Sequence, residues 1–193
     1  MDDSPHIGFS VRQVSFILCA VVLTRLTFLL NGYGADPDAW LVAHSASMLW
    51  NVGIYHESRL PGYPLHEIIS APFVGVGGAL WSNTSALVAT LIAVFIWQRI
   101  VQRRTRHPHL LIICFAFAPV LWQHSAETLD YVWSLLFILG SLLAALNRRV
   151  LLSGLLLGIA AGFRPSNSIA FIPLVTFLYL ERVSARKLFS FLL

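Results

Sequence analysis

The chain has 193 residues, of which 57% are hydrophobic and 11% are charged, and its formal net charge is +4 at pH 7. A soluble domain of this size cannot bury so much apolar surface, so the composition predicts an integral membrane protein. The positive charge comes from short arginine clusters and not from a broad basic face, which argues against a nucleic-acid partner. Cys19 and Cys114 lie in separate apolar segments and indicate neither a disulfide framework nor a zinc site.

Six apolar segments are expected to be membrane-spanning helices, each of which needs roughly 17–25 residues. The third, fifth and sixth are short for this role, and Ser70–Leu80 is expected to be a re-entrant or surface helix that leads into the second. The predicted fold is therefore an all-α, polytopic bundle of transmembrane helices. The expected spans are Val14–Leu30, Asn83–Val101, Leu110–Gln123, Leu129–Leu146, Val150–Phe163 and Ile169–Leu180.

The basic residues gather on one side of these expected spans. Ten of the 13 Lys and Arg residues fall there, while Arg59 and Arg164 fall on the other side and Arg25 lies inside the first span. By the positive-inside rule, the N-terminus is then cytoplasmic. The insert at residues 32–82 and the turns at residues 124–130 and 164–167 share the outer face. Arg25 has two open interpretations, a functional charge within the membrane or a side chain that snorkels to the interface.

The insert at residues 32–82 is expected to contain amphipathic helices at the membrane interface. Asp36–Gly53 mixes tryptophans and aliphatic residues with polar ones, as a helix lying in the interface does. Asp36 or Asp38 is placed to cap its start, and Pro37 suits an early helical position. A capping role for these aspartates is one interpretation, and a chemical role is the other.

The last residues, 188–193, follow a basic cluster and have the composition of the start of a seventh span. We therefore expect residues 1–193 to be the N-terminal part of a longer transmembrane module.

The order of these motifs resembles the GT-C glycosyltransferases, in particular bacterial members similar to protein O-mannosyltransferases and aminoarabinose transferases. Asp36-Pro37-Asp38 stands where that family has an acidic pair at the start of its first outer loop. Pro61-Gly62-Tyr63-Pro64-Leu65 follows in the place of a Pro-Pro-Leu-Tyr-like element. The resemblance covers most of the chain. It departs from the family in having Asp-Pro-Asp in place of Asp-Glu, and these residues do not include the family's C-terminal half.

Two further motifs carry the same resemblance. Ser125-Ala126-Glu127 resembles the family's acidic turn between the third and fourth spans. Gly154–Gly158 followed by Phe163-Arg164-Pro165 resembles its glycine-rich fifth span, which ends in Arg-Pro.

The resemblance implies an inverting transfer of one sugar from a polyprenyl-phosphate donor to a hydroxyl of a glycan, lipid or protein acceptor. The transfer would take place on the outer face of a bacterial inner or plasma membrane, and no cofactor is implied. A single carboxylate can act as the base, with Asp38 the first candidate and Asp36 the second. Arg59 and Arg164 are the expected phosphate clamps, because the guanidinium fork matches phosphate. The remaining expected substrate-binding residues are Tyr63, His66, Glu67 and Glu127, and Glu67 and Asp130 are expected to pair with the arginines.

Simpler roles stay open at this point. Arg164 can snorkel to lipid headgroups, Glu127 can cap the fourth span, and Pro61–Pro64 can be only a rigid turn. The four histidines on the outer side, His44, His56, His66 and His124, lack the spacing of a known zinc motif, so a divalent metal is not indicated.

The alternative functions are a polytopic transporter or flippase-like protein, and an inactive truncated fragment. Transporters place polar groups near the bilayer midplane in broken helices, often in two repeated halves. Here the polar groups gather at one face and the sequence has no internal repeat, which favours the enzyme.

Overall fold

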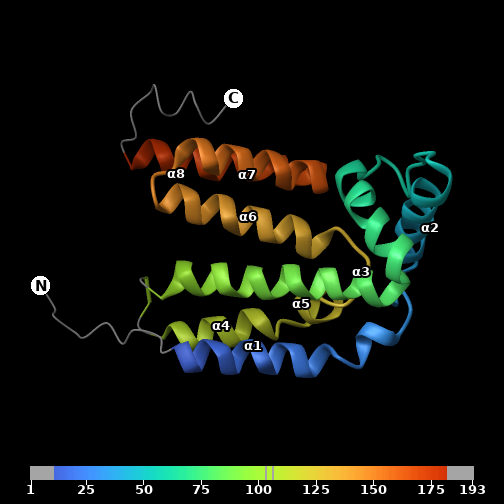
Figure 1. Cartoon of the computed structure of the whole chain (residues 1–193). Coiled ribbons are helices and arrows are strands. Elements are labelled where there is room, and N and C mark those ends of the chain that lie inside the picture. The colour runs from blue at the N-terminus through green and yellow to red at the C-terminus, as the bar shows by residue number, and fades with distance from the viewer. Residues whose placement is uncertain (1–10, 103, 106, 182–193) are drawn as a thin grey trace, which may run out of the picture.

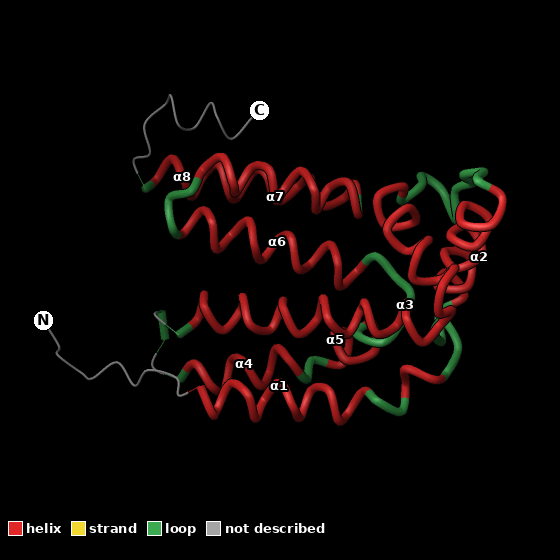
Figure 2. Tube along the Cα trace, viewed as in Figure 1, coloured by secondary structure: helices red, strands yellow, loops and turns green. Residues whose placement is uncertain are grey.

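The computed structural model describes residues 11–102, 104–105 and 107–181, and every regular element in this part of the chain is a helix (Figures 1 and 2). The expected all-α fold class is confirmed. Residues 188–193, where a seventh span is expected to start, lie outside the described residues. The helices and 3₁₀ turns (η) are α1 (Val11–Arg25), η1 (Phe28–Leu30), α2 (Pro37–Val52), α3 (Pro64–Val101), α4 (Pro108–Ala116), α5 (Pro119–His124), α6 (Tyr131–Leu146), α7 (Val150–Phe163), η2 (Pro165–Ala170) and α8 (Phe171–Leu180).

The bundle is built around α3 and α6. In Figure 1 the helices lie side by side with similar axes, and α2 stands at one end of them. α3 contacts α1, α4 and α6, and α6 contacts α7 and α8. One hydrophobic cluster includes Val21, Ala93 and Val132 from α1, α3 and α6, and a second includes Leu157 and Leu178 from α7 and α8. The apolar segments of the sequence are therefore the helices of one packed bundle.

The expectation of six spans is met only in part. Within the described residues, α3 is the one helix long and apolar enough to cross a membrane, with 38 residues, and α6, α7 and the η2–α8 segment are apolar but shorter. The expected third span is divided into α4 and α5, because Pro119 follows Ala118, which is held in a non-helical conformation (ψ 130°). The expected first span ends as an α-helix at Arg25 and continues as a 3₁₀ turn.

A sharp bend divides α3 into two arms. Gly78 has φ 58° and ψ −145°, a conformation open to glycine because it lacks a Cβ. The first arm packs on α2 beside a small apolar cluster of Ala46, Ala71 and Val74, and the second arm runs through the bundle (Figure 1). The helix expected at Ser70–Leu80 is therefore present, and the bend lies within it.

Arg25 ends α1 inside the protein and does not snorkel outward. Its side chain is 0% exposed, and its guanidinium donates to the Ser125 hydroxyl at 3.2 Å and to the Ala116 carbonyl at 2.5 Å. It also lies over the rings of Phe117 and Trp122. Arg25 thus ties the end of α1 to the break between α4 and α5.

The packing of α2 on the first arm of α3 is tight at one glycine. A Cβ on Gly75 would lie 2.2 Å from the ring of Trp50, whereas a Cβ on Gly158 would meet nothing within 4 Å. Gly75→Ala should therefore lower the free energy of unfolding by about 1–3 kcal/mol. Gly158→Ala, the matched control, should be neutral or stabilising by up to about 1 kcal/mol. Thermal unfolding of both variants in one detergent checks this, and equal melting temperatures would contradict the packing.

Candidate functional site

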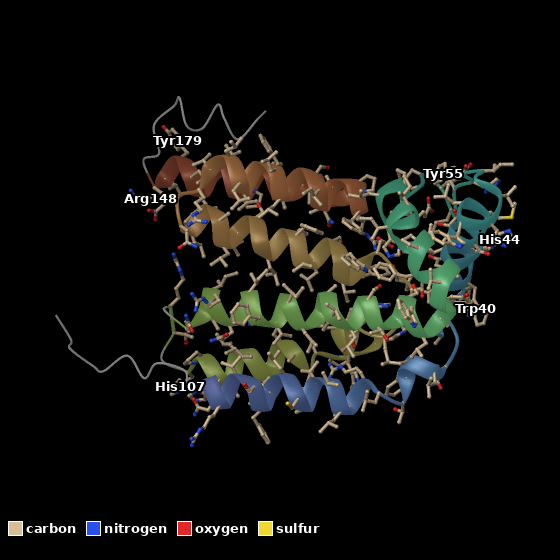
Figure 3. The ribbon with its side chains drawn as sticks, in the orientation of Figure 1. Trp40, His44, Tyr55, His107, Arg148 and Tyr179 are labelled. Carbon is tan, nitrogen blue, oxygen red and sulfur yellow. The ribbon has the colours of Figure 1, made fainter. Side chains whose placement is uncertain are left out.

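The residues expected on the outer face meet at one end of the bundle. This end is formed by α2, the loop of residues 53–63, the first arm of α3, the turn of residues 125–130 and the end of α7. Figure 3 labels Trp40, His44 and Tyr55 at this end, while His107 and Arg148 are labelled at the opposite end. The residues expected on the outer face and those expected on the cytoplasmic face thus lie at opposite ends of the bundle.

Asp130 is the centre of the site. Its side chain is 0% exposed, and each of its oxygens meets a different arginine. Arg59 Nη2 lies 2.5 Å from Oδ1, and Arg164 Nη1 lies 3.2 Å from Oδ2. The expected pairing of Asp130 with both candidate clamp arginines is confirmed. It joins the 53–63 loop to the start of α6 and the end of α7.

Arg59 extends this network to Asp38. Its Nε lies 3.4 Å from Asp38 Oδ2, and its guanidinium lies 4.3 Å from the centre of the Tyr63 ring. Burial by itself would lower the pKa of Arg59, but Asp130, Tyr63 and Asp38 together raise this pKa above its ordinary value. Arg59 is therefore a cation, and its Nη1 is buried without a hydrogen-bond partner among the described residues.

Asp36 and Asp38 have different roles at the start of α2. Asp36 is the N-cap, with extended backbone dihedrals, and its Oδ1 accepts from the backbone N–H of Asp38 at 2.9 Å. The capping interpretation is thus confirmed for Asp36. The side chain of Asp38 is 40% exposed and faces Arg59. Of the two candidate bases, Asp38 is the one with its carboxylate in the arginine network.

Glu67, in the first turn of α3, binds the 53–63 loop instead of the arginines. It is 0% exposed and accepts hydrogen bonds from Tyr55 Oη at 2.6 Å, from the Ser58 backbone N–H at 2.9 Å and from the Ser58 hydroxyl. Burial and this hydrogen bond raise the pKa of Tyr55, which keeps the phenol protonated as a donor. In the described part of the chain the carboxylates paired with Arg59 and Arg164 are Asp38 and Asp130, so the expected pairing of Glu67 is corrected.

His66 lies beneath the site and not on its surface. It is 1% exposed, its Nε2 is 3.4 Å from the Ser70 hydroxyl, and its ring faces Phe163 at 6.1 Å. Its Nδ1 has no partner among the described residues. The expected contact between His66 and a phosphate has no open path in this structure.

Glu127 belongs to a second branch of the site. Its Oε1 accepts from the Ala35 backbone N–H at 3.0 Å, and its Oε2 lies 2.9 Å from His124 Nδ1. The His124 ring stacks on Tyr131 at 4.5 Å, and Arg164 lies 4.1 Å from the centre of the same Tyr131 ring. The residue at the N-cap position of α6 is Asp130, so capping does not account for Glu127. Tyr131 was not among the expected site residues. Its position next to Asp130 was the one feature of the sequence that could have indicated it.

A cavity of about 430 Å³ opens beside Glu127. It lies between the segment after α1 and helix α5, and its walls are mostly apolar. Its lining includes Phe28, Asn31, Ala35, Trp122, Gln123 and Glu127. The cavity gives the site room for an apolar or amphipathic group next to a carboxylate.

Within the described ranges, no three His, Cys, Asp or Glu side chains come close enough together to hold a metal ion. Comparison of the chain with protein-family models, with curated proteins and with solved structures gave no match.

The hold of Glu67 on the 53–63 loop is testable with a matched pair of substitutions. Glu67→Gln leaves a buried amide facing three donors, and should lower the free energy of unfolding by about 1–3 kcal/mol. The Ser58 amide should then exchange its hydrogen faster. Glu57→Gln, an exposed change in the same loop, should alter neither property. Hydrogen exchange and thermal unfolding measure both, and unchanged protection of Ser58 in Glu67→Gln would contradict this role.

Proposed function

We propose that this protein is a membrane-embedded glycosyltransferase of the GT-C type, which moves a sugar from a polyprenyl-phosphate donor to an acceptor hydroxyl. The observation that carries the proposal is the network Asp38–Arg59–Asp130–Arg164 at one end of an apolar helix bundle. This network combines two positioned guanidinium groups with a partly exposed carboxylate. Phosphate departure and proton removal from an acceptor need these two kinds of group.

The helix bundle supports a location in a membrane. α3 has the length and hydropathy of a spanning helix, and large apolar side chains point outward from several other helices. Examples are Phe16 on α1, Leu155 on α7 and Ile172 on α8, which are 75%, 52% and 66% exposed. Lipid is the surrounding in which such surfaces are favourable. α6, α7 and η2–α8 would then be shorter spans. The end opposite the site, which carries Arg99, Arg104, Arg148 and Arg149 and is called the cationic end below, is cytoplasmic, and the site faces outward.

Arg59 and Arg164 are suited to hold the phosphate of the donor. Two arginines share the single buried carboxylate of Asp130, so this group of three carries a net positive charge. Asp130 fixes the direction of both guanidinium groups, and Tyr63 and Tyr131 pack against their faces. Arg59 Nη1 is buried and has no hydrogen-bond partner among the described residues. A positioned guanidinium fork binds phosphate more strongly than a mobile one, because less entropy is lost on binding.

Asp38 is suited to remove the proton of the acceptor. In a single inverting displacement, the acceptor oxygen forms a bond to the anomeric carbon while the bond from that carbon to the phosphate oxygen breaks. Asp38 takes the hydroxyl proton, and the departing phosphate keeps the electron pair next to the two arginines. A donor phosphate that engages Arg59 also competes with Asp38 for this cation, which leaves the carboxylate available as a base. Glu127 and its cavity supply a polar anchor and apolar walls for a substrate.

The role of Asp38 is tested by replacing its carboxylate. Asp38→Asn should lower kcat by roughly 10²–10⁴-fold, because an amide cannot accept the proton. Donor KM should change little. Asp36→Asn is the matched control, since asparagine caps a helix about as well as aspartate. It should keep most of the turnover. Steady-state kinetics of sugar transfer measure both, and near-normal kcat in Asp38→Asn would remove Asp38 from the mechanism.

The phosphate clamp is tested by comparing lysine with alanine at each arginine. Lysine keeps the charge but loses the fork, so Arg164→Lys should raise donor KM less than Arg164→Ala does, without restoring the native value. The same order is expected at Arg59. A residue that only reaches toward headgroups would be replaced fully by lysine, and alanine would then leave donor affinity unchanged. Alanine should lower stability in either case, because each arginine pairs with the buried Asp130. Donor affinity, measured on all four variants, therefore separates these outcomes, and thermal unfolding verifies that each variant is folded.

A further inference from the structure

A second hollow lies at the cationic end of the bundle, far from the Asp38–Arg59–Asp130–Arg164 network. It has a volume of about 400 Å³ and lies between the end of α3 and the end of α6. His107 follows α3 and Arg148 follows α6, and Figure 3 labels both at this end. The lining includes Arg99, Gln102, Arg104, Leu143, Leu146 and Asn147.

The charge in this hollow is positive. No Asp or Glu is among the described residues that line it. The Arg99 guanidinium lies 5.9 Å from the centre of the Phe95 ring, a contact that leaves its N–H groups available to a ligand. Arg104 follows α3 and is exposed. Two helix C-termini add about one negative charge in total, so two arginines leave the hollow cationic.

The hollow offers amide as well as guanidinium donors, and part of its lining is apolar. Gln98 Nε2 donates to Gln102 Oε1 at 3.0 Å, which occupies the oxygen of Gln102 and leaves its amide NH₂ to donate. Asn147 brings a second amide from α6. Leu143 and Leu146 are apolar residues of the lining. A ligand that fits has an anionic, oxygen-rich head and an apolar body.

From these features we infer that the hollow is a binding site for the phosphate headgroup of an anionic phospholipid. The arginines hold the phosphate, the amides of Gln102 and Asn147 bind its ester or glycerol oxygens, and the acyl chains lie along the leucines. Basic pockets between helices at the cytoplasmic surface have the charge and depth to recognise such headgroups. This inference depends on the proposed membrane location and not on sugar transfer.

Native mass spectrometry of the full chain in detergent tests the site with dioleoylphosphatidylglycerol as the probe. Arg99→Gln and Arg104→Gln should each weaken its binding roughly fivefold, and the double variant roughly 30-fold. Arg149→Gln is the matched control, because it removes a charge at the same end from a residue that does not line the hollow. It should change the affinity less than about twofold. All four are exposed-surface changes, and thermal unfolding verifies that the variants fold.

Two other probes make the result decisive. Dioleoylphosphatidylcholine, whose choline cation offsets its phosphate, should bind more weakly than the anionic lipid and should lose less affinity on the arginine substitutions. Inorganic phosphate alone should also bind more weakly, because it has no chains to place against Leu143 and Leu146. Equal affinity for inorganic phosphate would identify a free-phosphate site and overturn the lipid assignment. An equal loss of lipid affinity in Arg149→Gln would show that general surface charge causes the binding, and this too would overturn the lipid assignment. Sugar transfer is not part of either measurement, so a failure here is distinct from a failure of the transferase proposal.

Discussion

The buried carboxylate of Asp130 is the constraint on which the end of the bundle depends. Removing a carboxylate from water is costly unless it is paired and hydrogen-bonded. Asp130 meets this need with Arg59 on one oxygen and Arg164 on the other. Its two partners come from segments that are 71 and 34 residues away in the sequence. The 53–63 loop and the end of α7 must therefore both reach the start of α6, or a charge stays buried without a partner.

Other carboxylates hold the loops around this centre by accepting backbone N–H groups. Asp36 accepts from Asp38, Glu67 from Ser58, and Glu127 from Ala35. Each bond ties an acidic side chain to a segment without regular structure or to the start of a helix. A charged acceptor makes such bonds stronger than neutral ones. Asp36, Glu67 and Glu127 thus shape the site, whereas Asp38 has a partly exposed carboxylate in the arginine network.

Local rules predicted the parts of this structure that depend on neighbouring residues. The two ends of α2 were expected near Asp36-Pro37 and Gly53. In the structure, Asp36 is the N-cap of this helix, and Gly53 ends it in a left-handed conformation. The break before Pro119 also depends on a local residue, but it was not predicted, because Leu110–Gln123 was expected to be a single span. Long-range pairing was less accessible. The sequence offered Glu67 and Asp130 equally as partners for the arginines, and only the packing of α2, α3 and α6 decides between them.

The same limit applied to His66, which lies one position before Glu67 in the first turn of α3. Sequence placed it among polar loop residues, but the turn of the helix directs its ring toward Phe163 of α7. Burial of a polar side chain cannot be read from its neighbours when the covering residue is about 100 positions away.

The two ends of the bundle use arginine in different ways, and the difference follows from burial. At the Asp130 end the guanidinium groups are largely covered, with side-chain exposures of 13% for Arg59 and 26% for Arg164, so each requires a carboxylate or aromatic partner. At the opposite end, Arg99 and Arg104 are exposed and can remain without a carboxylate partner. Covered and paired arginines have a fixed direction, which suits selection among substrates and stabilisation of a departing charge. Exposed arginines keep their mobility, and they suit a ligand present at high local concentration, as a phospholipid would be at the proposed membrane location. The paired arginines are therefore the ones suited to the proposed chemistry, and the exposed ones to the proposed lipid headgroup.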